Sequence, residues 1–128
     1  MNPKRFLTIG GVIVLVYGIV GFILPDTPLL GNVLLFTGAE NIVHVILGIA
    51  AVAAAYVLRP DWQRWLTATV GIVALVFFVV GLLVMSAPPL NLAPANLEVI
   101  DTLVHLVVGT WALWAAFRPA PAVVAQPT

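Results

Sequence analysis

Four long apolar runs dominate this sequence and restrict what it can fold into. They cover residues 6–24, 41–58, 65–85 and 97–117. Each approaches the roughly 20 residues that a helix needs to cross about 30 Å of hydrocarbon. The runs are apolar on every side, whereas the strands of a membrane barrel alternate between polar and apolar residues. The sequence therefore predicts an all-α membrane protein with four transmembrane helices.

The composition between and within these runs supports that prediction. Hydrophobic residues make up 62% of the chain and charged residues 8%, whereas about a quarter of a soluble domain is charged. Prolines follow the predicted helix ends, at Pro25, Pro60, Pro88 and Pro119, where they interrupt the hydrogen-bond ladder. A net charge of zero provides no basic field for nucleic acid. The absence of cysteine excludes disulfides, thiolate nucleophiles and Cys-ligated metals.

The distribution of basic residues predicts the orientation. If successive helices alternate in direction, all five lie on one side of the membrane: Lys4, Arg5, Arg59, Arg64 and Arg118. The opposite connections, residues 25–39 and 86–96, contain no Lys or Arg. Because positive charge marks the cytoplasmic side, we expect a multi-pass protein of a prokaryotic plasma membrane with both termini in the cytoplasm. The first run has spanning length and no small-residue cleavage site, so we expect it to be retained rather than removed as a signal peptide.

An internal repeat relates the second run to the fourth. A shift of 61 positions aligns Glu40, His44, Gly48, Ala51 and Ala55 with Asp101, His105, Gly109, Ala112 and Ala116. The first and third runs align more loosely. We therefore expect one domain, residues 1–118, in which an up-down bundle is built from two parallel-repeat hairpins, about 1–60 and 61–118. Residues 119–128, rich in Pro and Ala, are expected to form a disordered cytoplasmic tail.

The repeated residues follow one stripe of each helix, because they recur every three or four positions. Small residues allow helices to pack closely in lipid, so we expect this stripe to face inward. His44 and His105 then lie inside the bundle, each one turn below an acid, Glu40 or Asp101. In the simplest interpretation each carboxylate accepts a hydrogen bond from its imidazole and the pairs hold helices together. Ionisable residues within the membrane are also candidates for function.

The two His–acid pairs leave several functional interpretations open. His44 and His105 are candidate axial ligands of a haem b or a chlorin held between diagonal helices. Glu40 and Asp101 would then orient the imidazoles, and Gly48 and Gly109 would either pack helices or make room for the macrocycle. A zinc or copper site formed by the two histidines and two acids is a further alternative. Proton-linked transport or pH sensing by the histidines is another.

The sequence shows no recognisable set of catalytic residues. Ser86 is the only serine and is distant in sequence from both histidines, so no nucleophile–His–acid set is visible, and dinucleotide and P-loop motifs are absent. No catalytic residue is assigned. We expect a small integral membrane protein that acts through helix packing. Its expected partners are the lipid bilayer and either a second copy or another membrane protein.

The motif around each histidine resembles that of a known family. Asn41-x-x-His44-x-x-x-Gly48 and Asp101-x-x-x-His105-x-x-x-Gly109 are similar to the repeated N/D-x-x-H-x-x-x-G pattern of small bacterial four-helix membrane proteins of unknown function. Thr102 stands where the second motif often carries Asn, which alters the polar residue there. The resemblance implies four spans and a paired-histidine face. It implies no biochemical activity.

Overall fold

The computed structural model describes residues 1–24, 38–86 and 99–118. Within these ranges it contains four helices: α1 (Pro3–Ile23), α2 (Gly38–Val57), α3 (Pro60–Ser86) and α4 (Val99–Phe117). All four are long and apolar enough to cross a membrane, and none of the described residues forms a strand. The prediction of an all-α membrane protein with four transmembrane helices is therefore confirmed. The predicted disordered tail, residues 119–128, lies outside the described residues.

Two helices begin at prolines that the sequence pattern had left outside the spans. Pro3 and Pro60 are the first residues of α1 and α3. A proline is well suited to this position because its missing N–H would have no helical partner there. The side chain of Asn2 caps α1 by accepting a hydrogen bond from the backbone N–H of Arg5 at 2.9 Å. Pro60 therefore starts α3, and α2 has already ended at Val57.

A buried glutamine holds the tight turn between α2 and α3. Gln63 lies in the first turn of α3, and its amide nitrogen donates to the carbonyl oxygens of Ala55 at 3.0 Å and Leu58 at 2.9 Å. Carbonyls in the last turn of a helix lack partners within that helix, so Gln63 supplies donors to the end of α2. This pair of bonds joins the start of α3 to the end of α2.

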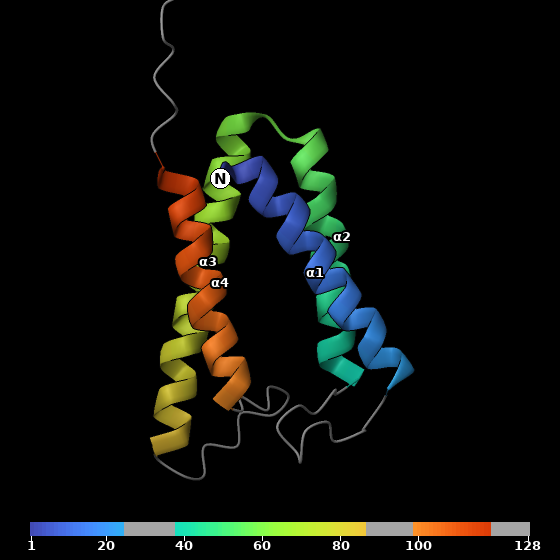
Figure 1. Ribbon diagram of the computed structural model, residues 1–128, viewed down its shortest axis with the longest axis vertical. Helices are drawn as coiled ribbons and strands as arrows, with labels where there is room; N and C mark the ends of the chain where they lie inside the picture. Colours follow the sequence, from blue (N-terminus) through green and yellow to red (C-terminus); the bar gives the residue numbers. More distant parts are fainter. Residues whose placement is uncertain (25–37, 87–98, 119–128) are drawn as a thin grey trace, which may run out of the picture.

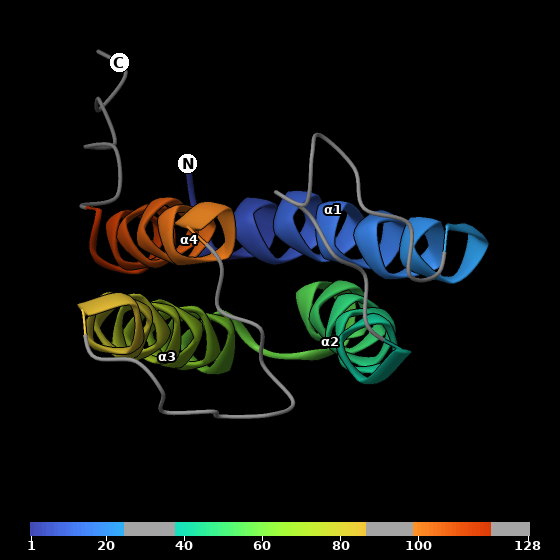
Figure 2. The same ribbon diagram turned by 90° about the horizontal axis from the view of Figure 1, so that it is seen from below.

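The helices pair into two hairpins that meet at one end. The most extensive packing joins α1 to α2 and α3 to α4, and smaller contacts join α1 to α3 and α4. The hairpins lie side by side at the end that carries the N-terminus and the α2–α3 turn, and they diverge toward the opposite end (Figure 1). Viewed along the bundle, α2 and α4 occupy diagonal corners (Figure 2). The bundle is therefore up-down, as predicted, but it is splayed.

The contact between hairpins is a small apolar cluster near the turn. Its buried members come from three helices: Phe6, Leu7, Ala54, Ala55, Ala112 and Ala115. Trp111 is partly buried against this cluster, and its ring meets that of Phe6 edge-on with centroids 4.8 Å apart. Trp62, Trp65 and Trp114 are exposed instead. The shared core of the molecule thus lies at one end, and the repeated histidines lie toward the other.

Candidate functional site: two histidine positions in separate hairpins

His44 lies in the second turn of α2, on the side that faces α1. Its Nδ1 is 2.7 Å from the carbonyl oxygen of Glu40, one turn earlier in α2. Its ring meets the ring of Tyr17 on α1, with centroids 4.9 Å apart at an interplanar angle of 60°. The side chain is half-buried. One backbone hydrogen bond and one aromatic contact therefore hold this imidazole within the first hairpin.

His105 has the same kind of environment in the second hairpin. Its Nδ1 is 2.6 Å from the carbonyl oxygen of Asp101. Its ring lies 5.3 Å from that of Phe77 on α3, at an interplanar angle of 31°. It is also half-buried. Each histidine thus faces the partner helix of its own hairpin.

The hydrogen bonds determine which ring nitrogen carries the proton. A carbonyl oxygen can only accept, so Nδ1 of His44 and of His105 must be the donor. In the neutral ring the lone pair is then on Nε2. The acceptor differs from the one expected from the sequence, because it is the backbone oxygen of the acidic residue rather than its carboxylate. The helix itself provides this acceptor, since a side chain four residues later lies over that turn.

Gly48 and Gly109 lie at the closest approach of the helices within each hairpin. A Cβ atom on Gly48 would stand 2.6 Å from the backbone nitrogen of Leu15, and one on Gly109 would stand 2.7 Å from Cγ of Leu75. Both glycines are buried. The space beside them is filled by the partner helix, so these contacts describe helix packing rather than clearance for a macrocycle.

The structure does not bring the two histidine positions together. The main packing partner of α2 is α1, and that of α4 is α3. The two hairpins diverge toward the end where α2 and α4 begin (Figure 1). Within residues 1–24, 38–86 and 99–118, no three His, Cys, Asp or Glu side chains are grouped closely enough to hold a metal ion. His44, His105, Glu40 and Asp101 therefore form two separate pairs and not one four-ligand centre.

Two buried polar residues beside the histidine motifs pack on glycines. Asn41 is 1% exposed, and a Cβ atom on Gly21 of α1 would collide with its side-chain amide. Thr102 is 2% exposed, and a Cβ atom on Gly81 of α3 would collide with its hydroxyl. In the described part of the chain, neither Asn41 Oδ1 nor Thr102 Oγ1 has a hydrogen-bond partner. The sequence marked both residues only as motif positions. Their burial follows from the glycine that faces each of them on the partner helix, Gly21 opposite Asn41 and Gly81 opposite Thr102.

Contacts recur at matched positions in the two hairpins. The offset is 60 residues from α1 to α3 and 61 from α2 to α4. The matched contacts are Tyr17–His44 with Phe77–His105, Gly48–Leu15 with Gly109–Leu75, Gly11–Val52 with Gly71–Leu113, and Gly21–Asn41 with Gly81–Thr102. The second hairpin thus contains a counterpart of each of these four contacts in the first.

Charge is separated along the length of the molecule. Lys4, Arg5, Arg59, Arg64 and Arg118 flank helix ends at the N-terminus, the α2–α3 turn and the end of α4, which lie at one end of the bundle (Figure 1). Partial burial, and then the nearby Arg118 and Arg5, lower the pKa of the Met1 amine. Glu40 and Asp101 lie instead in the first turns of α2 and α4, at the other end.

No family model, no curated protein and no solved structure matches this chain.

Proposed function

We propose that this chain is a non-enzymatic membrane protein that acts by associating with a second copy of itself. One observation carries this proposal: the helices are tightly paired within each hairpin, but the hairpins touch only near one end. Only 22–28% of each span is buried within the chain. Within the chain, one hairpin already packs against the other over part of its length. A second copy offers hairpins of the same kind to the faces that remain open.

The two hairpins are, in this proposal, copies of one unit. The four matched contacts support an internal parallel repeat, because independent hairpins have no reason to place aromatic–histidine and glycine–leucine pairs at constant offsets. The small-residue contacts explain how each unit closes on itself in lipid, where burial of apolar surface gives no advantage. Association between copies would then extend the pairing that the chain performs internally.

The location in this proposal is the plasma membrane of a prokaryote, with both termini in the cytoplasm. Five basic residues at one end of the bundle support this orientation. The test is single-cysteine labelling, which is unambiguous because the chain contains no cysteine. Gly38→Cys should react with a membrane-impermeant maleimide in intact cells, and Asn2→Cys only after permeabilisation. The opposite pattern would reverse the orientation.

Association is tested by cysteine cross-linking in native membranes. One exposed apolar residue is replaced on each helix: Ile13→Cys, Leu47→Cys, Ile72→Cys and Val107→Cys. A self-associating chain should give a disulfide dimer from one helix face and little from the others. The wild-type protein, extracted with its surrounding lipid in polymer nanodiscs, should have the mass of an oligomer. A monomer that cross-links equally poorly at all four positions would refute self-association.

A second candidate, ligation of a cofactor, rests on the imidazole geometry. An Nδ1–H bound to a backbone carbonyl is a common arrangement for a histidine that ligates through Nε2. Because the two histidines lie in separate hairpins, they would serve two single-histidine sites for a chlorin or haem b instead of one shared site. The gently purified protein should then show a Soret or chlorin band at about two per chain, halved by His44→Ala or His105→Ala. A spectrum without such a band, together with a metal analysis that finds none, would eliminate this candidate.

A further inference from the structure

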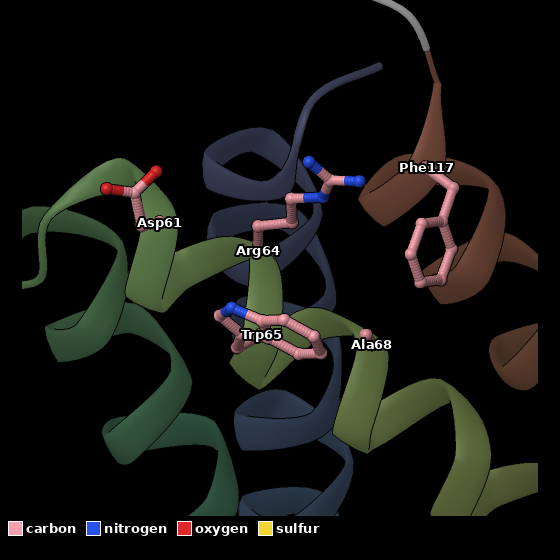
Figure 3. A pocket seen from close by; sticks show the side chains of 5 residues that line it. All are labelled: Asp61, Arg64, Trp65, Ala68 and Phe117. Carbon is pink, nitrogen blue, oxygen red and sulfur yellow. The ribbon is translucent and has the colours of Figure 1, made fainter.

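A small pocket opens at the basic end of the bundle, far from the histidines. It has a volume of about 230 Å³ and lies between the start of α3 and the end of α4. Its lining combines one cation, one acid, two aromatic rings and one small residue: Arg64, Asp61, Trp65, Phe117 and Ala68 (Figure 3). None of the chemistry discussed for the histidines uses this pocket.

Arg64 supplies positive charge to the pocket. Its guanidinium carbon lies 5.4 Å from the centroid of the Phe117 ring, across the gap between α3 and α4. Asp61 lines the same pocket, but the Arg64 side chain extends away from it and toward Phe117 (Figure 3). A guanidinium fork is matched to the oxygens of a phosphate. The cation is therefore available to an anion that enters the pocket.

The surrounding charge favours the same kind of ligand. Arg118 lies over the Trp114 ring at 4.9 Å, and Lys4 lies over the Tyr56 ring at 4.9 Å, both at this end of the molecule. Burial lowers the pKa of the Met1 amine, and Arg118 and Arg5 lower it further because both lie close to the N-terminus. Asp61 is the one described acid at this end.

The apolar lining determines which anion fits. Trp65 is 68% exposed and Phe117 is 56% exposed, although both belong to membrane-spanning helices. Exposed aromatic rings at helix ends lie at the level of lipid headgroups. A soluble phosphate has no apolar part to place against these rings. A phospholipid has both parts: a headgroup phosphate that matches the cation, and a glycerol and acyl region that matches the aromatic and alanine side chains.

We infer that this pocket binds the headgroup of an anionic phospholipid, with Arg64 as the phosphate ligand. Basic recesses between transmembrane helices are suited to such lipids, and one cation near the membrane surface contributes about a fivefold preference. The inference does not depend on self-association or on the histidines, because the pocket is formed within one chain by α3 and α4.

Native mass spectrometry of the full chain tests this binding. The protein is released from nanodiscs containing phosphatidylcholine and phosphatidylglycerol, and the retained lipids are counted. Wild-type protein should retain one phosphatidylglycerol per chain in preference to phosphatidylcholine. Arg64→Gln should reduce that preference about fivefold, whereas Arg64→Lys should keep most of it. Arg59→Gln is the matched control, because Arg59 is exposed at the same end but does not line the pocket.

Three results would overturn the inference. One is a wild-type protein with no preference for phosphatidylglycerol. Another is an equal loss in Arg59→Gln and Arg64→Gln, which would indicate a diffuse field rather than a site. The third is displacement of the retained lipid by millimolar inorganic phosphate, which would indicate a site for a soluble anion. Circular dichroism of each variant checks that it is folded, and Arg64→Lys preserves the charge if Arg64→Gln does not fold.

Discussion

Replacing Gly48 with alanine adds one methyl group where α2 comes closest to α1. The new Cβ would stand 2.6 Å from the backbone nitrogen of Leu15 and 2.7 Å from its Cα. To reach ordinary contact at 3.4 Å, the helices must separate by about 0.8 Å. Overpacking costs about 1–3 kcal/mol, and the upper value applies because the obstacle is backbone. Alanine returns about 1 kcal/mol through its helix preference, so we expect a net loss of about 2 kcal/mol.

Gly10 provides a matched control for this substitution. A Cβ atom there would meet the rings of Phe6 and Trp111 at 3.9 Å, which is ordinary contact. Gly10→Ala therefore makes the same chemical change without a clash, and stability should stay the same or rise by up to about 1 kcal/mol. Unfolding in detergent micelles titrated with sodium dodecyl sulfate, followed by circular dichroism, measures both variants. If Gly48→Ala is no less stable than Gly10→Ala, the close approach of α1 and α2 is not as described.

Three further predictions concern the second hairpin, the imidazoles and the turn. Gly109→Ala should cost less than Gly48→Ala in the same assay, because the nearest atoms to its Cβ belong to the Leu75 side chain, which can rotate, and the nearest backbone atom, the Gly71 oxygen, is farther away at 3.1 Å; an equal or larger cost would contradict this. Nitrogen-15 NMR of neutral His44 and His105 should show the proton on Nδ1, and predominant Nε2 protonation would rule out the carbonyl hydrogen bonds. Gln63→Ala should destabilise the protein by about 1–3 kcal/mol, because two carbonyl oxygens at the end of α2 lose the hydrogen bonds that the Gln63 amide donates to them. An unchanged unfolding midpoint would show that this turn holds without them.

The number and type of helices could be predicted because lipid imposes a simple requirement. A run of about 20 apolar residues satisfies its backbone hydrogen bonds only as a helix, so the four spans followed from length and composition. The predicted starts of the helices were less accurate. The first predicted span began at residue 6 and the third at residue 65, whereas α1 begins at Pro3 and α3 at Pro60. These first turns contain charged and proline residues, which an apolar pattern excludes but a helix end accommodates.

The candidate site was only partly predictable. The stripe that contains His44 and His105 could be read from three- and four-residue spacing, and its glycines and most of its alanines are indeed buried. The rings of Tyr17 and Phe77 could not be assigned as partners, because one helix alone does not define its register against the next. The acceptor was misassigned for a related reason. Both the carboxylate and the carbonyl of residue i−4 lie within reach of a histidine, and spacing does not distinguish them.

The splay of the hairpins could not be predicted, and the reason bears on function. In water, an exposed apolar face favours burial, so hydrophobic pattern predicts which surfaces meet. In lipid the same Val, Ile and Leu side chains are equally well solvated by acyl chains, and only shape and polar contacts decide which helices associate. The close contacts here are those where glycine allows a backbone to approach, and they occur within hairpins. Between hairpins, the buried contact among the described residues is the cluster of alanine, leucine and phenylalanine near the turn, with Trp111 packed against it. Hydrophobicity alone therefore gives a second copy no advantage over lipid at the open faces, and the proposed self-association has to rest on shape and polar contacts there.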